Sequence, residues 1–283
     1  MQVISDPADL APYGGNLFVP TMGALHDGHA ALIRSAARLR DAAPAGGPPV
    51  VVSIFVNPTQ FNDAADLARY PRTIDADLAT CHRAGADAVF VPDPETVYPP
   101  GATIPVPPLP EVATEPRLED ALRPGHFAGV CQVVARLFEL VTPSAAVFGE
   151  KDYQQLAVVR AMTTALSLPI EIIPAPTVRE KDGLAMSSRN RFIPPEHRPR
   201  AAAISRALCE ASAPGNSTAH KAEAAMRKVL LAAGFAEAEI QYAVVRDAQT
   251  LGAVKPGAAG RALIAAALAP VRLIDNAPWS PPS

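Results

Sequence analysis

Short apolar runs alternate with amphipathic stretches along the first two thirds of the chain. Most of the runs are apolar on both faces and contain β-branched residues, which is typical of strands in a sheet that is covered on both sides. The predicted strands are Leu17–Pro20, Val50–Val56, Ala88–Val91, Ala145–Phe148 and Ile170–Ile173. The predicted helices between them are Ala30–Asp41, Ile74–Ala84, Val130–Leu140 and Tyr153–Leu166. This alternation predicts an α/β fold with a doubly wound parallel sheet and right-handed crossovers.

The pattern changes after Pro176, where a polar and charged segment, Thr177–Arg191, begins. Two alanine-rich helical stretches and three runs with strand character follow: Pro195–Ser212, Ser217–Ala233, Ile240–Arg246, Ala262–Leu268 and Val271–Ile274. We therefore predict two domains, residues 1–176 and a second, smaller α+β domain of residues 177–283. Pro92–Pro110 is rich in proline and has no helical period, so we expect an irregular surface loop there.

Composition excludes several classes of protein. The 25 basic and 28 acidic residues nearly balance, which disfavours a nucleic-acid binder. The 3 cysteines form no CxxC pair, which argues against a disulfide framework or a cysteine zinc site and favours buried thiols in a reducing compartment. The chain shows no signal peptide and no apolar run of about 18 residues. We therefore expect a cytoplasmic protein with no membrane association.

The first candidate site follows the first predicted strand, because ligands of doubly wound sheets bind beyond the carboxyl ends of the strands. In Thr21–His29 (TMGALHDGH), Gly23 and Gly28 let the backbone approach a ligand closely. A helix N-terminus favours phosphate, and His26 and His29, on one helical turn, can donate hydrogen bonds to phosphate oxygens. The alternative is a helix start with two incidental histidines, and a zinc site would lack a third nearby ligand.

A second motif, Ser53–Phe61 (SIFVNPTQF), lies at the end of the second predicted strand. Asn57 and Pro58 end that strand and place Gln60 at the carboxyl edge of the sheet. The amide of Gln60 offers donors and an acceptor, which suits a substrate with hydroxyl and carboxylate groups. The alternative is a polar turn residue.

A third motif, Phe148–Gln155 (FGEKDYQQ), comes directly after the fourth predicted strand. Gly149 permits close approach, Lys151 can meet a phosphate, and Asp152 can cap a helix or accept from a ribose hydroxyl. Gln155, one helical turn further on, would face the same crevice. The alternative is a capped helix with exposed charges.

A fourth motif, Met186–Asn190 (MSSRN), lies between the two predicted domains. Two hydroxyl groups and a guanidinium in succession suit a triphosphate. The neighbouring Arg179–Gly183 is typical of a mobile, charged loop that closes over nucleotide. The alternative is a solvated linker.

Two lesser candidates remain. Arg123–Phe127 is a turn whose basic pair could contact phosphate or cap a helix. Asp75 and Asp77 open a predicted helix, where acidic groups are often partners of the helix dipole. Asp77 could instead help to hold Mg²⁺, which keeps several waters and uses phosphate oxygens as ligands.

The four motifs together resemble the pantothenate synthetase family, ligases that join pantoate to β-alanine. The similarity runs from Thr21 to Arg191 and returns weakly at Arg272–Asn276. The pattern His26–His29 (HxGH) alone would indicate only the wider nucleotidyltransferase group, which includes some aminoacyl-tRNA synthetases. The resemblance implies a Rossmann-like first domain, a second domain that closes over the ATP site, and an Mg²⁺-dependent cytoplasmic homodimer. It also implies that (R)-pantoate is adenylated by ATP, with release of pyrophosphate, and that the amine of β-alanine then displaces AMP.

The resemblance also implies roles for individual residues. His29 would be a proton donor and His26 a phosphate contact, while Gln60 and Gln155 would hold pantoate, with Gln60 also near β-alanine. Lys151, Ser187, Ser188 and Arg189 would bind the phosphates, with Lys151 and Arg189 acting in catalysis. The implied ATP-binding residues are Met22, Gly23, Ala24, Leu25, His26, Asp27, Gly28, His29, Gly149, Glu150, Lys151, Asp152, Val178, Met186, Ser187, Ser188 and Arg189.

Two other interpretations compete. A different adenylate-forming ligase or nucleotidyltransferase would not need both glutamines. A non-catalytic nucleotide-binding module would be expected to have lost a histidine, Lys151 or the Ser-Ser-Arg element, and all of these are present.

Overall fold

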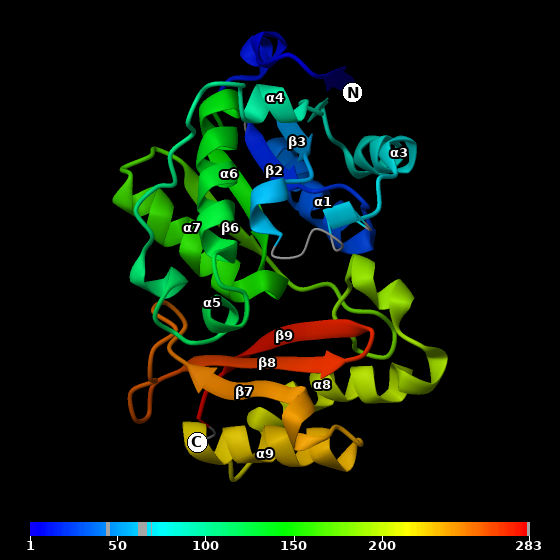
Figure 1. Ribbon diagram of the computed structural model, residues 1–283, viewed down its shortest axis with the longest axis vertical. Helices are drawn as coiled ribbons and strands as arrows, with labels where there is room; N and C mark the ends of the chain where they lie inside the picture. The colour runs from blue at the N-terminus through cyan, green and yellow to red at the C-terminus, as the bar shows by residue number, and fades with distance from the viewer. Residues whose placement is uncertain (44–45, 62–66, 69, 282–283) are drawn as a thin grey trace. The chain divides into compact units, whose positions relative to one another are not determined.

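The structure is a computed structural model that describes residues 1–43, 46–61, 67–68 and 70–281 (Figure 1). By its internal contacts the chain divides into two compact units. The first unit contains Met1–Gly149 and Gln154–Pro176, and the second contains Glu150–Tyr153 and Thr177–Ser283. Local sequence pattern did not indicate that Glu150–Tyr153 would join the second unit, because this segment directly follows a strand of the first.

A six-stranded parallel sheet forms the centre of the first unit, with the strand order β1-β4-β3-β2-β5-β6. Its strands are β1 (Gln2–Ile4), β2 (Leu17–Thr21), β3 (Val50–Ile54), β4 (Ala88–Phe90), β5 (Ala145–Gly149) and β6 (Glu171–Ala175). The predicted parallel, doubly wound sheet is confirmed. Strand β1 was not predicted, because it is short and buries only Ile4. The strand order reverses between β2 and β5, and such a reversal opens a crevice for ligands beyond the carboxyl ends of the strands.

Helices cover both faces of this sheet because neighbouring residues of a strand point to opposite sides. Val19 of β2 belongs to an apolar cluster with Ile33, whereas Phe18 makes an edge contact with Phe138, at 6.4 Å between ring centroids. The α-helices are α1 (Asp27–Ala42), α3 (Ile74–Ala84), α4 (Pro94–Val97), α5 (Glu119–Leu122), α6 (His126–Val141) and α7 (Tyr153–Ala165).

Several of these helices differ from the prediction. Helix α1 begins at Asp27 rather than Ala30, and α5 was not predicted. Helix α6 begins at His126 rather than Val130, since Gly129 is accommodated within it. The short helix α4 interrupts the segment Pro92–Pro110, which was expected to be irregular throughout. Proline suits the first turn of a helix, where its missing N–H has no partner to lose, and Pro94 occupies that position.

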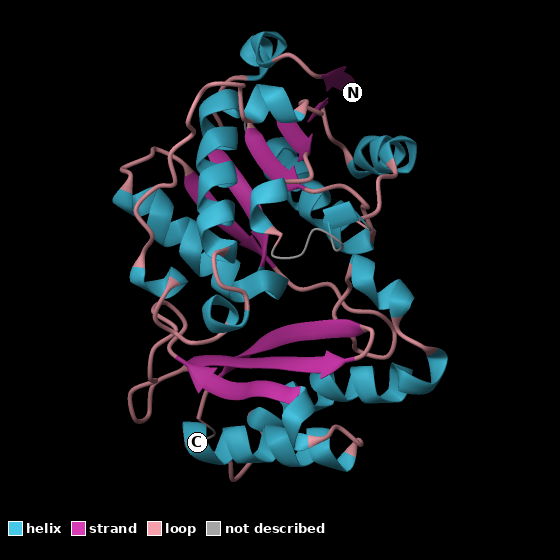
Figure 2. Cartoon of the chain, in the orientation of Figure 1, coloured by secondary structure: helices cyan, strands magenta, loops and turns pink. Residues whose placement is uncertain are grey.

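The second unit is built on an antiparallel three-stranded sheet, β7 (Ile240–Arg246), β8 (Gly260–Leu268) and β9 (Val271–Trp279), in that order (Figure 2). Helices α8 (Arg198–Ala211) and α9 (Ala219–Ala232) pack against it and share its apolar core. Trp279 is buried there and donates from Nε1 to the Ala211 carbonyl at 2.9 Å. Strand β9 continues beyond the predicted end at Ile274 because its polar residues Asp275 and Asn276 are buried and hydrogen-bonded.

Short 3₁₀ helices connect these elements. They are η1 (Pro7–Tyr13), η2 (Pro58–Gln60), η3 (Glu111–Ala113), η4 (Glu150–Asp152), η5 (Ser188–Phe192), η6 (Pro195–His197) and η7 (Glu237–Glu239). Among the described residues, no helix is long and apolar enough to cross a membrane.

The cysteines only partly match the expectation of buried thiols. Cys81 and Cys131 are buried, and burial raises the pKa of each to about 12, with the Asp77 carboxylate adding to the effect on Cys81. Cys209 is exposed, so the expectation is wrong for this residue. It lies on the solvent side of α8, whose other side packs on the sheet through alanine, isoleucine and leucine.

Candidate active site

The turn between β2 and α1 has an unusual backbone. Gly23 and Ala24 have φ angles of 79° and 51°, and Ala24 is a non-glycine residue in the left-handed region. This conformation directs two successive backbone N–H groups toward α3. The N–H of Ala24 donates to Asp77 Oδ2 at 3.0 Å, and the N–H of Leu25 donates to Oδ1 at 2.7 Å.

Asp77 is buried in the first turn of α3. Besides the two backbone groups, its carboxylate accepts a hydrogen bond from Thr73 Oγ1 at 3.2 Å. The carboxylate therefore anchors the Met22–Leu25 turn in this structure. The sequence did not suggest this anchor, because the contact joins residues far apart in the chain. The assignment of Asp77 as an Mg²⁺ ligand stays a prediction; within the described part of the chain no group of three or more His, Cys, Asp or Glu residues is arranged to hold a metal ion.

His26 and His29 order each other at the start of α1. His26 is the N-cap residue, and its Nδ1 accepts a hydrogen bond from the N–H of Gly28 at 3.1 Å. Nδ1 of His29 accepts from the N–H of His26 at 3.3 Å, and the two ring centroids lie 4.1 Å apart. A neutral imidazole that accepts at Nδ1 carries its proton on Nε2. In this neutral form, both rings can donate a hydrogen bond from Nε2–H beside the N-terminal end of the helix.

The Gln60 side chain lies against the first motif. Its Nε2 is 2.8 Å from Sδ of Met22, and its Oε1 accepts from Asn57 Nδ2 at 3.2 Å. Asn57 is itself buried and donates to the carbonyl of Gly129 at 3.1 Å. The structure therefore brings together the motifs that follow β2 and β3. The hydrogen bond from Asn57 orients the Gln60 amide.

The backbone of Gln60 packs closely on α6. A Cβ atom at Gly129 would lie only 2.5 Å from the Thr59 carbonyl oxygen, so glycine is required for this approach. Nδ1 of buried His126 lies 3.1 Å from the Gln60 carbonyl oxygen. In this structure His126 contacts the Gln60 main chain, and its contact with phosphate stays a prediction. Sequence reasoning missed Gly129, since a glycine at the edge of a helical pattern does not reveal what packs on it.

The neighbouring glutamines of α7 differ in their surroundings. Gln154 is buried, donates to the Val112 carbonyl and to Asp120 Oδ1, and accepts from the N–H of Glu119, each at 2.9 Å. Its amide therefore holds loops of the fold. Gln155 is half-buried, which leaves it the better candidate for contact with a ligand.

The second unit contains most of the remaining candidates, whereas Gly149 ends β5 in the first unit. Val178 and Met186 are held side by side by the hydrogen bond from the Met186 N–H to the Val178 carbonyl, at 2.9 Å. Between them, Arg179 and Ala185 form a β-bridge. Ser187 caps η5, its Oγ accepting from the N–H of Arg189 at 3.3 Å. Hydrogen bonds donated by the main-chain N–H groups of Met186 and Arg189 thus order the motif.

The charged loop Arg179–Gly183 is held by ion pairs rather than left to solvent. Arg198 binds Glu180 at 2.7 Å and Asp182 at 2.6 Å, and its guanidinium holds the pKa of Asp182 below the usual range. In the same unit, Lys151 Nζ lies 3.4 Å from Asp152 Oδ1. The structure thus brings the first two motifs together in the first unit and orders the loop before the fourth motif in the second.

Comparisons with known proteins agree on one family. A family model described as pantoate-beta-alanine ligase matches residues 14–278. A pantothenate synthetase of Nocardioides sp. is 50% identical over 269 residues, covering 92% of this chain and 77% of the relative. One of Myxococcus xanthus is 48% identical, covering 91% of this chain and 86% of the relative.

Solved structures give the same result. The crystal structure of pantothenate synthetase from Thermus thermophilus is similar with a TM-score of 0.86 and 43% identity, covering 98% of this chain and 99% of that one. A pantoate-beta-alanine ligase from Francisella tularensis, complexed with beta-gamma ATP and beta-alanine, has a TM-score of 0.75 and 29% identity, covering 98% and 97%.

Proposed function

The chain belongs to the pantoate–β-alanine ligase family, and we propose that the residues described above carry out the ligation in two steps. The enzyme condenses (R)-pantoate with β-alanine to pantothenate and converts ATP to AMP and pyrophosphate. The observation that carries the assignment of the residues is the pair His26 and His29, ordered as Nε2–H donors at the start of α1. These donors stand where the strand order of a parallel sheet reverses, the usual place for a nucleotide.

The chemistry follows from the poor reactivity of a carboxylate as an acyl donor. In the first step a carboxylate oxygen of pantoate attacks the α-phosphorus of ATP, and pyrophosphate leaves with the electron pair of the broken P–O bond. In the second step the amine of β-alanine attacks the acyl carbon, AMP leaves, and the nitrogen loses a proton. The work of the protein is to position the reactants and to stabilise the charge that builds on the phosphate oxygens.

Hydrogen-bond donors of several motifs serve ATP in this proposal. The backbone of Met22–His29 and the Nε2–H groups of its two histidines face the phosphates, with His29 as the proton donor. Lys151 and Arg189 contribute positive charge, and the hydroxyl groups of Ser187 and Ser188 add donors. The ATP-binding set is Met22, Gly23, Ala24, Leu25, His26, Asp27, Gly28, His29, Gly149, Glu150, Lys151, Asp152, Val178, Met186, Ser187, Ser188 and Arg189.

Pantoate binds to Gln60 and Gln155, and β-alanine binds near Gln60. The fixed orientation of the Gln60 amide supports this assignment, because an amide held by Asn57 presents a defined donor and acceptor. Mg²⁺ bound with ATP would neutralise charge on the phosphates, and Asp77 is the residue of this chain that would help to hold it. We further propose that the protein is a cytoplasmic homodimer. Light scattering on the purified protein tests the oligomeric state, and a measured mass of one subunit would contradict the dimer.

Replacing Gln155 with alanine is expected to raise the KM for pantoate about tenfold, since about 1.4 kcal/mol is lost with a polar contact to a substrate, while the KM for ATP changes little. Steady-state kinetics with each substrate varied in turn measures the effect. The matched control is Gln154→Ala, which should lower the melting temperature through its lost contacts with Val112 and Asp120 and leave both KM values near normal. Equal changes of both KM values in Gln155→Ala would remove Gln155 from the pantoate site.

The reaction is tested by pyrophosphate release from Mg²⁺–ATP and pantoate, with and without β-alanine. Pantoate-dependent release, with turnover to AMP and pantothenate once β-alanine is added, is the expected result, and excess chelator should abolish it. No response to pantoate in a folded protein that binds ATP would overturn the substrate assignment. Undiminished activity in excess chelator would overturn the role of Mg²⁺.

A further inference from the structure

Two adjacent polar residues, Asp275 and Asn276, are buried in the middle of β9, each with 3% of its surface exposed. Successive residues of a strand point to opposite sides, so burial of both means that polar partners are supplied on both sides. A buried polar group without partners costs free energy, and the partners of these two residues are therefore informative.

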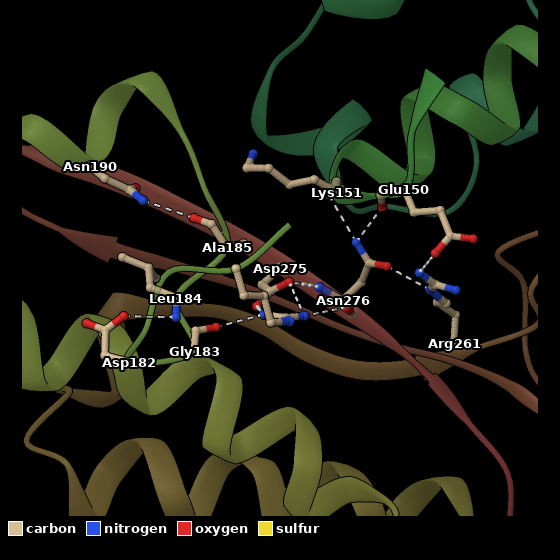
Figure 3. A network of polar contacts seen from close by, with 11 residues as sticks. Glu150, Lys151, Asp182, Gly183, Leu184, Ala185, Asn190, Arg261, Asp275 and Asn276 are labelled. Atoms are coloured by element: carbon tan, nitrogen blue, oxygen red, sulfur yellow. Dashed lines mark hydrogen bonds and ion pairs between the residues drawn. The ribbon is translucent and has the colours of Figure 1, made fainter. Parts of the chain in front are cut away.

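The amide of Asn276 reaches the segment that carries Lys151. Its Nδ2 donates to the carbonyl oxygens of Glu150 and Lys151, at 2.8 Å and 3.0 Å, and its Oδ1 accepts from Arg261 Nε at 2.7 Å (Figure 3). Both hydrogens of the amide and its oxygen are thus engaged. Two consecutive main-chain carbonyls are fixed by one side chain, which sets the path of the backbone from which the Lys151 side chain starts.

Arg261 of β8 completes this attachment. Its Nη2 donates to Glu150 Oε2 at 2.9 Å, and its guanidinium lies 4.2 Å from the ring centroid of Tyr153. The Tyr153 hydroxyl donates to the Ala248 carbonyl at 2.9 Å. The segment Glu150–Tyr153 is therefore fastened at both ends to the rest of the second unit.

Asp275 holds the other nucleotide segment. Its carboxylate receives two parallel hydrogen bonds from Arg179, at 2.5 Å and 3.0 Å. Arg179 also donates to the Gly183 carbonyl at 3.0 Å and to the Asn276 carbonyl at 3.3 Å, and these contacts hold the turn between Val178 and Met186 in place. A bidentate arginine–carboxylate pair restricts geometry more than a single contact does.

We propose that Asp275 and Asn276 are positioning residues. From one strand they fix the placement, relative to each other, of the two ATP-binding segments of the second unit, Glu150–Asp152 and Val178–Arg189. Neither side chain is assigned to touch ATP; each acts through the residues that do. The inference rests on the proposed function, since it takes those segments as the binders of ATP. It predicts that loss of Asn276 affects ATP selectively, whereas a role confined to stability would affect all substrates alike.

The test compares Asn276→Ala with a matched control, Asn16→Ala. Asn16 is likewise a buried amide that donates from Nδ2 to two main-chain carbonyls, those of Tyr13 and Val141, each at 2.9 Å. It belongs to the first unit, and both of these carbonyls lie outside the assigned site. Both variants should lower the melting temperature. Only Asn276→Ala should raise the KM for ATP and the Kd for a nonhydrolysable ATP analogue, each about tenfold, with the KM for pantoate nearly unchanged.

Equal kinetic behaviour of the two variants at a temperature where both are folded would overturn the proposal. If Asn276→Ala does not fold, Asp275→Asn serves instead, because it keeps the shape and the acceptor oxygen and loses the charge that binds Arg179. That variant should also raise the Kd for the ATP analogue, and an unchanged Kd would again overturn the proposal. Binding of the analogue, measured by calorimetry, does not require turnover. A wild-type enzyme that binds the analogue but shows no pantoate-dependent activity would therefore refute the proposed substrate, and the binding test of Asn276 would remain valid.

Discussion

The His29→Ala enzyme should lose about 10²- to 10⁴-fold in kcat, the range over which a positioned proton donor accelerates a reaction. The imidazole at this position carries its proton on Nε2, because Nδ1 accepts from the N–H of His26. Alanine removes both the proposed donor to the reacting phosphate and the contact between the two imidazole rings. Single-turnover measurement of pyrophosphate release without β-alanine, with pantoate and ATP saturating, isolates the adenylation step.

The fold should survive the change. The lost hydrogen bond to the His26 N–H is a capping interaction, for which about 1 kcal/mol of stability is typical. Far-ultraviolet circular dichroism and the melting temperature should therefore stay close to those of the parent. His220→Ala, which removes an exposed imidazole from α9, is the matched control and should behave as the parent in both assays. Near-normal turnover of His29→Ala would remove the assigned role.

Asp77→Asn should lower kcat/KM for ATP about 10²-fold, the loss that a misplacement of about 1 Å causes in a well-aligned site. The carboxylate accepts from the N–H groups of Ala24 and Leu25 and from Thr73. Asparagine offers one acceptor oxygen and turns an NH₂ group toward one of the two backbone N–H groups, so donor would face donor. The left-handed conformation of Ala24 would then lose its support, and a stability loss of about 1–3 kcal/mol is expected.

The control for Asp77→Asn is Asp75→Asn, which removes the same charge from the same first turn of α3 at an exposed position. It should leave the kinetics near normal. Raising Mg²⁺ separates the two roles of Asp77: an anchor of the turn predicts no recovery at high Mg²⁺, whereas a metal ligand predicts recovery toward parental activity. Parental kinetics in Asp77→Asn would reject both roles.

Residues whose purpose is local could be predicted from the sequence. The sheet strands, the helix after β2 and the motif at its start follow from periodicity, glycine placement and helix capping, all of which act within a few residues. Residues that act across the chain could not. Asp77 looked like a dipole partner, and the structural role of Gln154 was not predicted, because its hydrogen bonds join distant parts of the chain.

Buried polar residues inside strands misled the prediction for the same reason. Asp275 and Asn276 interrupt the apolar pattern of β9, so the predicted strand stopped at Ile274, although the structure continues it to Trp279. Their partners, Arg179, Glu150 and Lys151, lie about a hundred residues earlier in the chain. Local pattern carries no record of such contacts, and here those contacts decide both the length of the strand and the placement of the candidate ATP segments.

The path of the chain between the two units has a consequence for protein engineering and for inheritance by recombination. The chain enters the second unit at Glu150, returns at Gln154 and enters it again at Thr177. A graft or crossover at Thr177 alone would bring Arg261 and Asn276 from one parent and their partners Glu150 and Lys151 from the other. The smaller unit is thus not a portable module, and a working chimera must exchange Glu150–Tyr153 together with Thr177–Ser283.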